Sequence, residues 1–332
     1  MKTIVAGLLV ITATAGPAEA QLGRRTAQSI SPTDKQQGAA AHPQLIAQFG
    51  GAYAGPQARF VERVGRRVAL QSGLSNAGGD FVVTVLNSPV ENALAIPGGY
   101  IYITRQLLAL MNSEAELASV LGHEVGHVAA RHAAGRNTRS TIGSLLAAGA
   151  GALTKSDLAS RVVGTGAQLY TLRYGRNQEY EADTLGVRYM TAAGYDPYAA
   201  ADILSALDAS SSLTAQASGT GGRSLPSWVS THPNGEDRVR RAAQLAAASG
   251  RPETAPPQDT AFLRMLDGLP YGAAGERKVI RVVTVGPGDS VASLAARMAL
   301  PQLQRERFIT LNGLDPAQPL KVGTLVKLVV AA

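Results

Sequence analysis

Two histidines that flank a glutamate are the residues of this sequence best suited to chemistry. His123 and His127 enclose Glu124 in the pattern His-Glu-Val-Gly-His. Side chains at positions i and i+4 lie on one face of a helix, so both imidazoles can reach one metal ion. Glu124 follows the first histidine and can contact a water on the metal without binding the metal, which is the position of a general base. The sequence therefore predicts a catalytic metal site.

The metal ligands must be histidines and carboxylates, because the chain contains no cysteine and only 5 histidines. Two histidines and one carboxylate favour zinc, and we expect one Zn²⁺ per chain. A third histidine in the pattern HExxHxxGxxH is excluded, since Ala130 and Ala133 occupy the required positions. His132 follows His127 by about 140° around a helix, so we expect it to point away from the metal.

The third ligand is predicted among carboxylates later in the chain. Glu179 and Asp183 share a helix face with small and apolar residues, whereas Glu181 is turned toward solvent beside Arg188. Buried carboxylates need a charge partner, which a metal site supplies. We predict that Glu179 binds the metal and that Asp183 accepts a hydrogen bond that fixes the tautomer of a ligand histidine. The alternative is a helix stabilised by salt bridges.

Several elements must position these residues. Ser113 and Glu116 form the S-x-x-E pattern of a capping box, which predicts the start of the helix that carries His123. Residues 59–70 predict an amphipathic helix with its arginines toward solvent, and residues 81–86 and 96–104 predict strands.

The strand predicted over residues 96–104 offers a candidate substrate site. If it forms the edge of a sheet, an extended chain can bind as an added strand. The residues expected to bind substrate are Pro97, Gly98, Gly99, Tyr100 and Ile101. An ordinary hairpin edge is the alternative.

Together these motifs resemble peptidase family M48. The resemblance covers residues 45–247 and rests on Asn92-Ala93, Ala95, Pro97-Gly98-Gly99 and Ile101, then His123-Glu124-x-x-His127, Glu179-x-x-Ala182-Asp183, Thr231-His232-Pro233 and Arg238. It implies an α+β fold: a mostly helical gluzincin domain with a small sheet over the active-site helix. It also implies proteolysis, agrees with Glu179 as a ligand, and points to the soluble periplasmic branch associated with envelope quality control. Unfolded or misfolded envelope proteins are the substrates expected on this basis.

His232 is the expected donor to the oxyanion that forms during peptide hydrolysis. It precedes a proline in a Ser- and Thr-rich segment, where a core role is not expected. Two alternatives stay open. His232 can instead occupy the fourth metal position and hold the enzyme latent, or it can be an ordinary exposed loop histidine.

The first 20 residues predict a secretory signal peptide cleaved after Ala20. Lys2 precedes an apolar run over residues 4–15, and Ala18-Glu19-Ala20 supplies small residues at the cleavage site. The apolar run falls short of the ~20 residues that a membrane span needs. We therefore expect a mature chain without a transmembrane segment, located in the periplasm.

The remaining chain divides by composition. We predict a flexible lead-in over residues 21–44, the peptidase domain over 45–247, a linker over 248–278 and a separate domain over 279–332. The last region has a βααβ order that resembles a LysM domain. The resemblance implies peptidoglycan binding through loops that contain Gly288, Asp289, Ser290 and Asn312. Arg305, Glu306 and Arg307 depart from the expected pattern, so packing or protein docking is an alternative.

Composition excludes several function classes. A net charge of +7 comes from scattered arginines, and aromatic residues make up only 5% of the chain, so no nucleic-acid partner is expected. Without cysteine, thiol catalysis and disulfide scaffolds are excluded. Two non-enzymatic alternatives are a periplasmic chaperone that keeps the zinc fold, and a peptidoglycan-binding adaptor with a latent zinc site.

Overall fold

A three-stranded sheet lies at the centre of the first part of the molecule. The computed structural model describes residues 29–74, 76–134, 174–218, 228–232, 235–254 and 257–332; the predicted signal peptide lies outside them. Strands β1 (Val82–Leu86), β2 (Ala93–Ile96) and β3 (Tyr100–Thr104) occur in the order β1-β3-β2. Strand β3 is parallel to β1 and antiparallel to β2. The strand predicted over residues 81–86 is confirmed.

The prediction of a single strand over residues 96–104 is wrong. This segment is a turn followed by the central strand, because Gly98 and Gly99 have φ of +93° and +85° and reverse the chain between β2 and β3. Only glycine adopts these angles without a steric cost. The outer strand on this side of the sheet is β2, and Ile101 lies in the middle strand.

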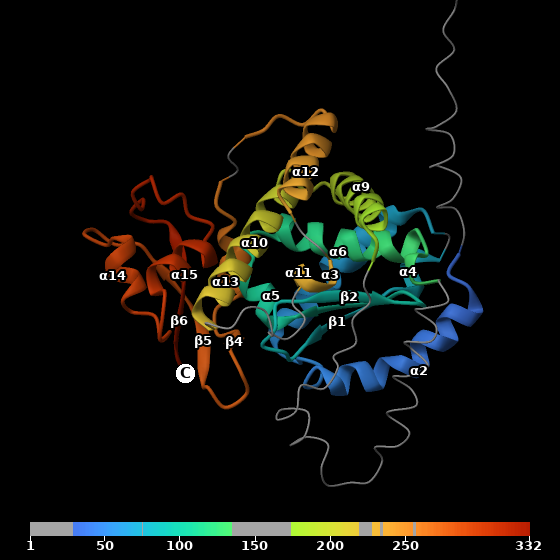
Figure 1. Ribbon diagram of the computed structural model, residues 1–332, viewed down its shortest axis with the longest axis horizontal. Helices are drawn as coiled ribbons and strands as arrows, with labels where there is room; N and C mark the ends of the chain where they lie inside the picture. Colours follow the sequence, from blue (N-terminus) through green and yellow to red (C-terminus); the bar gives the residue numbers. More distant parts are fainter. Residues whose placement is uncertain (1–28, 75, 135–173, 219–227, 233–234, 255–256) are drawn as a thin grey trace, which may run out of the picture.

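Helices cover both faces of the sheet (Figure 1). Helix α2 (Pro32–Gln48) lies below it, where Ala41, Leu45 and Phe49 form a cluster with side chains of the strands. Helices α3 (Pro56–Ala69) and α6 (Glu114–Ala129) pack on the other face. Helix α3 confirms the amphipathic helix predicted over residues 59–70. The lead-in predicted over residues 21–44 is wrong from residue 32 on, because Ser31 caps a helix that crosses the predicted domain boundary.

The remaining helices of this part pack on and around α6. They are α9 (Arg176–Ala192), α10 (Ala199–Ser218), α11 (Trp228–Thr231) and α12 (Glu236–Ala248). Short helices connect the strands to α3 and α6: Leu70–Ser72, α4 (Ala77–Asp80) and α5 (Arg105–Leu110). The α+β class with a small sheet is therefore confirmed for this part of the chain.

Residues 257–332 form what we term the C-terminal unit. It contains α13 (Thr260–Met265), β4 (Pro270–Tyr271), β5 (Lys278–Thr284), α14 (Val291–Ala295), α15 (Gln304–Leu311) and β6 (Leu325–Ala331). The strands form an antiparallel sheet in the order β4-β5-β6. The βααβ order is present, but the linker predicted over residues 248–278 is wrong in its second half. Phe262, Leu266 and Leu269 are buried there, so this segment belongs to the core.

The C-terminal unit is docked on the first part of the molecule and is not separate from it. One continuous hydrophobic cluster includes Leu117 and Leu121 of α6 and also Ile280 and Phe308 of the C-terminal unit. The ammonium of Lys327, which is 0% exposed, lies 2.8, 3.1 and 2.6 Å from the backbone oxygens of Ala109, Leu110 and Met111 at the end of α5. The C-terminal unit therefore packs against the first part of the molecule, and its identity as a LysM-like domain stays a prediction.

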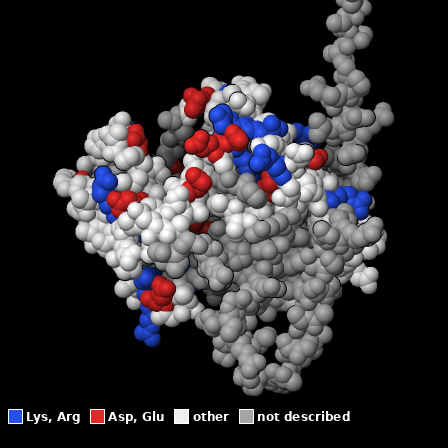
Figure 2. Space-filling view, viewed as in Figure 1, with Lys and Arg blue, Asp and Glu red and all other residues white. Residues whose placement is uncertain are grey.

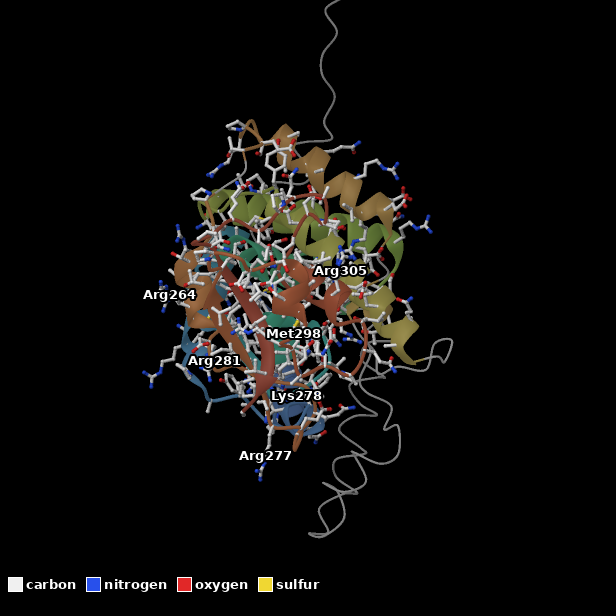
Figure 3. All side chains as sticks on the ribbon, turned by 90° about the vertical axis from the view of Figure 1, so that its left-hand side faces the viewer. Arg264, Arg277, Lys278, Arg281, Met298 and Arg305 are labelled. Carbon is white, nitrogen blue, oxygen red and sulfur yellow. The ribbon has the colours of Figure 1, made fainter. Side chains whose placement is uncertain are left out.

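Charged side chains of both signs share the surface. Figure 2 shows basic and acidic groups side by side in the region of α9 and α12. On the outer face of the C-terminal unit, Figure 3 labels the basic residues Arg264, Arg277, Lys278, Arg281 and Arg305. Lys278 pairs with Glu276, and Arg281 pairs with Asp267. Among the helices that the structure describes, none is long and apolar enough to cross a membrane.

Candidate metal centre

Helix α6 carries the His-Glu-x-x-His motif as predicted. It begins where the hydroxyl of Ser113 accepts a hydrogen bond from the backbone N–H of Glu116. The Glu116 carboxylate accepts a hydrogen bond from the backbone N–H of Asn112 and not from that of Ser113, the partner expected in a capping box. His123, Glu124 and His127 are only 4%, 0% and 1% exposed. Because α6 is covered on nearly all sides, these groups are held away from bulk water.

Small residues let α9 approach α6 closely. A Cβ placed on Gly122 would lie 3.0 Å from the Gly186 oxygen, and one on Gly126 would lie 2.9 Å from the Ala182 oxygen. From the other side, a Cβ on Gly186 would lie 2.8 Å from the His123 nitrogen. The two backbones are therefore almost in contact, and this crossing brings the carboxylates of α9 to the histidines of α6.

The predicted ligands meet at one point. The Nε2 atoms of His123 and His127 are 2.9 Å apart. Glu179 places Oε2 3.5 Å from His123 Nε2 and Oε1 3.5 Å from His127 Nε2. Nδ1 of His232 lies 3.1 Å from Glu179 Oε1 and 3.3 Å from His123 Nε2. One ligand atom from each of these four residues lies within 4.8 Å of all the others, so the site is able to bind one metal ion.

The electrostatics of the site fit a cation. Burial lowers the pKa of His127 well below its usual value, which leaves the ring neutral and able to bind a metal. Burial alone would raise the pKa of Glu179, but His232, His123 and Arg238 together lower it. Burial raises the pKa of Glu124 to about 8, and neither of its carboxylate oxygens has a hydrogen-bond partner among the described residues. A metal ion with a water beside Glu124 would satisfy this buried carboxylate.

Asp183 lies where the sequence places it. Its Oδ1 is 2.9 Å from His123 Nδ1, so it accepts the proton of this nitrogen and leaves Nε2 for the metal. Arg238 of α12 donates to Asp183 from Nε at 2.8 Å and from Nη2 at 2.6 Å, and its Nη1 lies 3.0 Å from Glu179 Oε2. Burial would raise the pKa of Asp183, but this guanidinium keeps it far below the usual range. Arg238 belongs to the quoted family pattern, but no motif indicated its contacts with Asp183 and Glu179.

His232 follows α11 directly and is 1% exposed, so the alternative of an exposed loop histidine is wrong. Its ring stacks on Trp228 with the ring centres 4.1 Å apart. Its Nε2 lies 3.6 Å from Glu124 Oε1. Trp228 therefore orients His232 toward both the ligands and the expected base, a role that no motif indicated.

The expectation that His132 points away is also wrong. It assumed a continuous helix, but α6 ends at Ala129 and Arg131 adopts a left-handed conformation with φ of +57°. The chain then turns back, so that His132 Nδ1 lies 2.9 Å from His127 Nδ1. Tyr174, which no motif marked, stacks on the ring of His127 with ring centres 3.8 Å apart.

The residues expected to bind substrate are only partly beside the metal site. Pro97 and Gly98 line a pocket together with Ala95, Ile96 and His127. Tyr100 and Ile101 lie in β3, whose backbone pairs with strands on both sides, so they cannot bind an added strand. If a substrate strand is added here, β2 is the strand that accepts it.

The residues expected to bind glycan contribute instead to local backbone structure. Asn312 donates to the Phe308 and Lys327 oxygens and accepts from the Lys327 N–H. Asp289 accepts from the Gly286 N–H, and Ser290 caps α14. Gly288 has a φ of +84° in the same loop. Glycan binding by the C-terminal unit therefore stays a prediction.

The fold and the site define the class of protein. A buried set of two histidines and a glutamate, with a second glutamate beside them on an HExxH helix, is the arrangement of a zinc metallopeptidase. The model of the family described as "Peptidase family M48" matches residues 56–246, more than half of the chain. The chain therefore belongs to peptidase family M48, whose members use zinc.

Curated relatives agree with this assignment. A mitochondrial metalloendopeptidase OMA1 from Arabidopsis thaliana is 34% identical over 167 residues, which are 50% of this chain and 32% of that relative. The OMA1 of Schizosaccharomyces pombe is 31% identical over 60% of this chain and 56% of its own length. A beta-barrel assembly-enhancing protease from Yersinia pestis is 27% identical over 65% of this chain and 44% of its own length. The matches thus span between about a third and just over half of these relatives, and they support a zinc metalloendopeptidase.

Proposed function

We propose that this protein is a zinc-dependent endopeptidase that hydrolyses peptide bonds of unfolded or misassembled envelope proteins. The observation that carries this proposal is the Glu124 carboxylate. It is fully buried, has no hydrogen-bond partner among the described residues, and lies beside a preformed set of metal ligands. Burying a carboxyl group without a hydrogen-bond partner costs free energy, and no structural contact of Glu124 offsets this cost. A role in catalysis is therefore the better explanation.

Each residue of the site has a separate role in the proposed hydrolysis. His123, His127 and Glu179 would hold the zinc ion, which supplies a Lewis acid and lowers the pKa of water toward neutrality. Glu124 accepts a proton from the attacking water and passes it to the nitrogen of the leaving amine. Asp183 keeps Nε2 of His123 free of a proton, and Arg238 holds the Asp183 carboxylate in place.

Three further features support protein substrates in the envelope. The outer strand β2 and the pocket lined by Ala95, Ile96 and Pro97 lie beside His127, which suits an extended chain. One group of relatives is named for enhancing β-barrel assembly. The amino-terminal segment has the pattern of a signal peptide, so the proposal includes a periplasmic location.

His232 has two candidate roles within this proposal. As a catalytic residue, it would donate a proton to the developing oxyanion. As a fourth ligand, it would close the site in the resting state. Its Nδ1 lies among the ligand atoms, 3.1 Å from Glu179 Oε1, and this placement favours the second role in the conformation described.

The first experiment compares the mature chain, residues 21–332, with its Glu124→Gln variant on an unfolded test protein such as reduced casein. Zinc content is measured in both proteins. We expect the variant to retain zinc and to lose about 10²- to 10⁴-fold in rate, because a positioned general base contributes roughly this factor.

Other outcomes would point elsewhere. Equal cleavage by the two proteins would show a contaminating protease or a wrong site. If neither zinc-loaded protein cleaves casein, His232→Ala separates the chaperone alternative from a closed site, because only a closed site gains activity when His232 is removed.

A further inference from the structure

The second metal ligand, His127, has a hydrogen-bonded partner that the motifs do not indicate. His132 Nδ1 lies 2.9 Å from His127 Nδ1, on the side of the ring away from the other ligands. On its other side, His132 Nε2 lies 3.3 Å from Glu181 Oε2. The side chain of His132 is 5% exposed, whereas that of Glu181 is 44% exposed.

Glu181 ends this series of hydrogen bonds and, because it is an acceptor, fixes their direction. A carboxylate only accepts, so the proton of His132 lies on Nε2 and is donated to Glu181. A neutral imidazole carries only one N–H, so in neutral His132 the Nδ1 atom has a lone pair and accepts the proton of His127 Nδ1. His127 is thereby left with a lone pair on Nε2, which is the nitrogen that faces His123 and Glu179.

We propose that His132 is a positioning residue for the metal site, which with Glu181 fixes the tautomer and ring orientation of His127. The two ligand histidines of α6 are then oriented by separate devices. His123 uses the buried Asp183, which Arg238 holds. His127 uses a neutral histidine that leads to a carboxylate at the surface.

The backbone is shaped to allow this contact. Five residues along a continuous helix would turn His132 by about 140° away from His127. Arg131, with φ of +57°, ends that geometry and starts the short 3₁₀ turn of His132–Ala134. A residue with a side chain rarely adopts this conformation, and such residues concentrate at functional sites. An ion pair of 3.3 Å between Arg131 and Asp34 of α2 helps to hold the turn.

The test measures zinc binding and the His127 tautomer, so it does not depend on proteolysis. The proposal does rest on the metal-binding role of the site. Four variants of the full mature chain are compared with the parent: His132→Leu, His132→Asn, Glu181→Gln and the control His42→Leu. His42 is a histidine outside the site that bonds the Tyr102 hydroxyl at 2.7 Å. Zinc affinity is measured by competition with a chromophoric chelator, and the tautomer from ¹⁵N shifts of the His127 ring in zinc-free protein.

We expect His132→Leu to weaken zinc binding about 10- to 100-fold, the usual loss when the hydrogen-bond partner of a ligand is removed. Its zinc-free His127 ring should show both tautomers. His132→Asn should recover most of the affinity, since its amide oxygen lies near the former Nδ1 and can accept the same proton. Glu181→Gln should have a smaller effect, because an exposed carboxylate contributes less. His42→Leu should bind zinc like the parent.

A folded His132→Leu variant with parental zinc affinity and an unchanged His127 tautomer would overturn the proposal. If this variant fails to fold, an additional variant, Glu181→Leu, decides, because it removes the carboxylate that accepts from His132 Nε2 and thereby fixes the direction. Exchange of the His127 proton between the two ring nitrogens would then support the proposal, and an unchanged tautomer would overturn it. Loss of peptide cleavage alone, with normal zinc binding, would instead concern the proposed function.

Discussion

At the scale of single residues, the site combines groups that would be costly to bury without a metal. Burial raises the pKa of Glu124 to about 8 and lowers that of His127, while Arg238 keeps Asp183 ionised. These shifts keep His127 neutral and Asp183 ionised, as their roles require, whereas Glu124 needs the positive charge of a bound metal ion to be ionised at neutral pH and act as a base. His232 is the residue whose role the arrangement leaves between two candidates, and its removal distinguishes them.

We predict that His232→Ala raises the rate of casein cleavage while zinc is retained. Three ligands remain after the change, and the position that His232 occupies near Glu179 and His123 becomes open to substrate. Steady-state kinetics and metal analysis of the purified variant would test this. A variant that holds zinc but has lost turnover would contradict it and would assign His232 as the donor to the oxyanion.

At the scale of elements, the crossing of α6 and α9 determines whether the ligands meet. Gly122, Gly126 and Gly186 leave no room for a Cβ at the crossing, so the carboxylates of α9 approach the histidines through backbone contact. Closely packed interiors transmit even small changes in volume. A methyl group at this crossing should therefore displace the ligands as well as lower the stability.

Gly186→Ala is predicted to lower the free energy of unfolding by about 1–3 kcal/mol, the usual cost of overpacking a core. The new Cβ would lie 2.8 Å from the His123 nitrogen, so α9 must shift and Glu179 with it, and zinc affinity should fall. Urea unfolding and chelator competition measure the two effects. Gly79→Ala is the matched control, because its Cβ meets nothing within 4 Å. Equal stability and zinc affinity for the two variants would contradict the prediction.

At the scale of the whole molecule, the C-terminal unit supports the corner between α5 and α6. The Lys327 ammonium caps the carbonyl end of α5, and Asp259 accepts a hydrogen bond from the backbone N–H of Glu114 at the start of α6. Arg105 and Gln106 of α5 bond the backbone of residues 270 and 272. The unit is therefore part of the scaffold that holds the active-site helix (Figure 1).

Replacing Lys327 tests this docking. Lys327→Met should lower the free energy of unfolding by about 1–3 kcal/mol, since it leaves three buried carbonyl oxygens without their hydrogen-bond donor. Lys321→Met, at an exposed position of the same unit, is the control and should have little effect. Urea denaturation of both variants provides the measurement. Parental stability of Lys327→Met would show that the docking contributes nothing.

Glu116, at the same corner between α5 and α6, makes the stability of the protein depend on pH. Burial raises its pKa from 4.5 to about 7. Between these two values the folded chain keeps a proton that the unfolded chain has released, so this group makes stability fall as the pH rises. Glu116→Gln should therefore gain stability relative to the parent as the pH increases through this window. Unfolding measured at several pH values would show it, and a difference that stays constant would contradict it.

The motif residues could be recognised in the sequence because their spacing follows the period of a helix. His123 and His127 on α6, and Glu179 and Asp183 on α9, each lie four positions apart, and a regular helix fixes the face that such residues share. The same period correctly indicated α3, and the capping-box pattern indicated the start of α6 at Ser113. The relation between sequence spacing and helix geometry was therefore sufficient to predict which residues share a face wherever the backbone is regular.

Tertiary structure decided the rest, because it depends on where regular backbone ends and on what packs against it. A single left-handed residue, Arg131, returned His132 to the site and overturned an argument that assumed a continuous helix. Segments that looked polar or linker-like, such as α2 and α13, became ordered because they cover apolar surface of distant elements. The docking of the C-terminal unit through Lys327 depends on contacts more than 200 residues apart, which no local pattern contains.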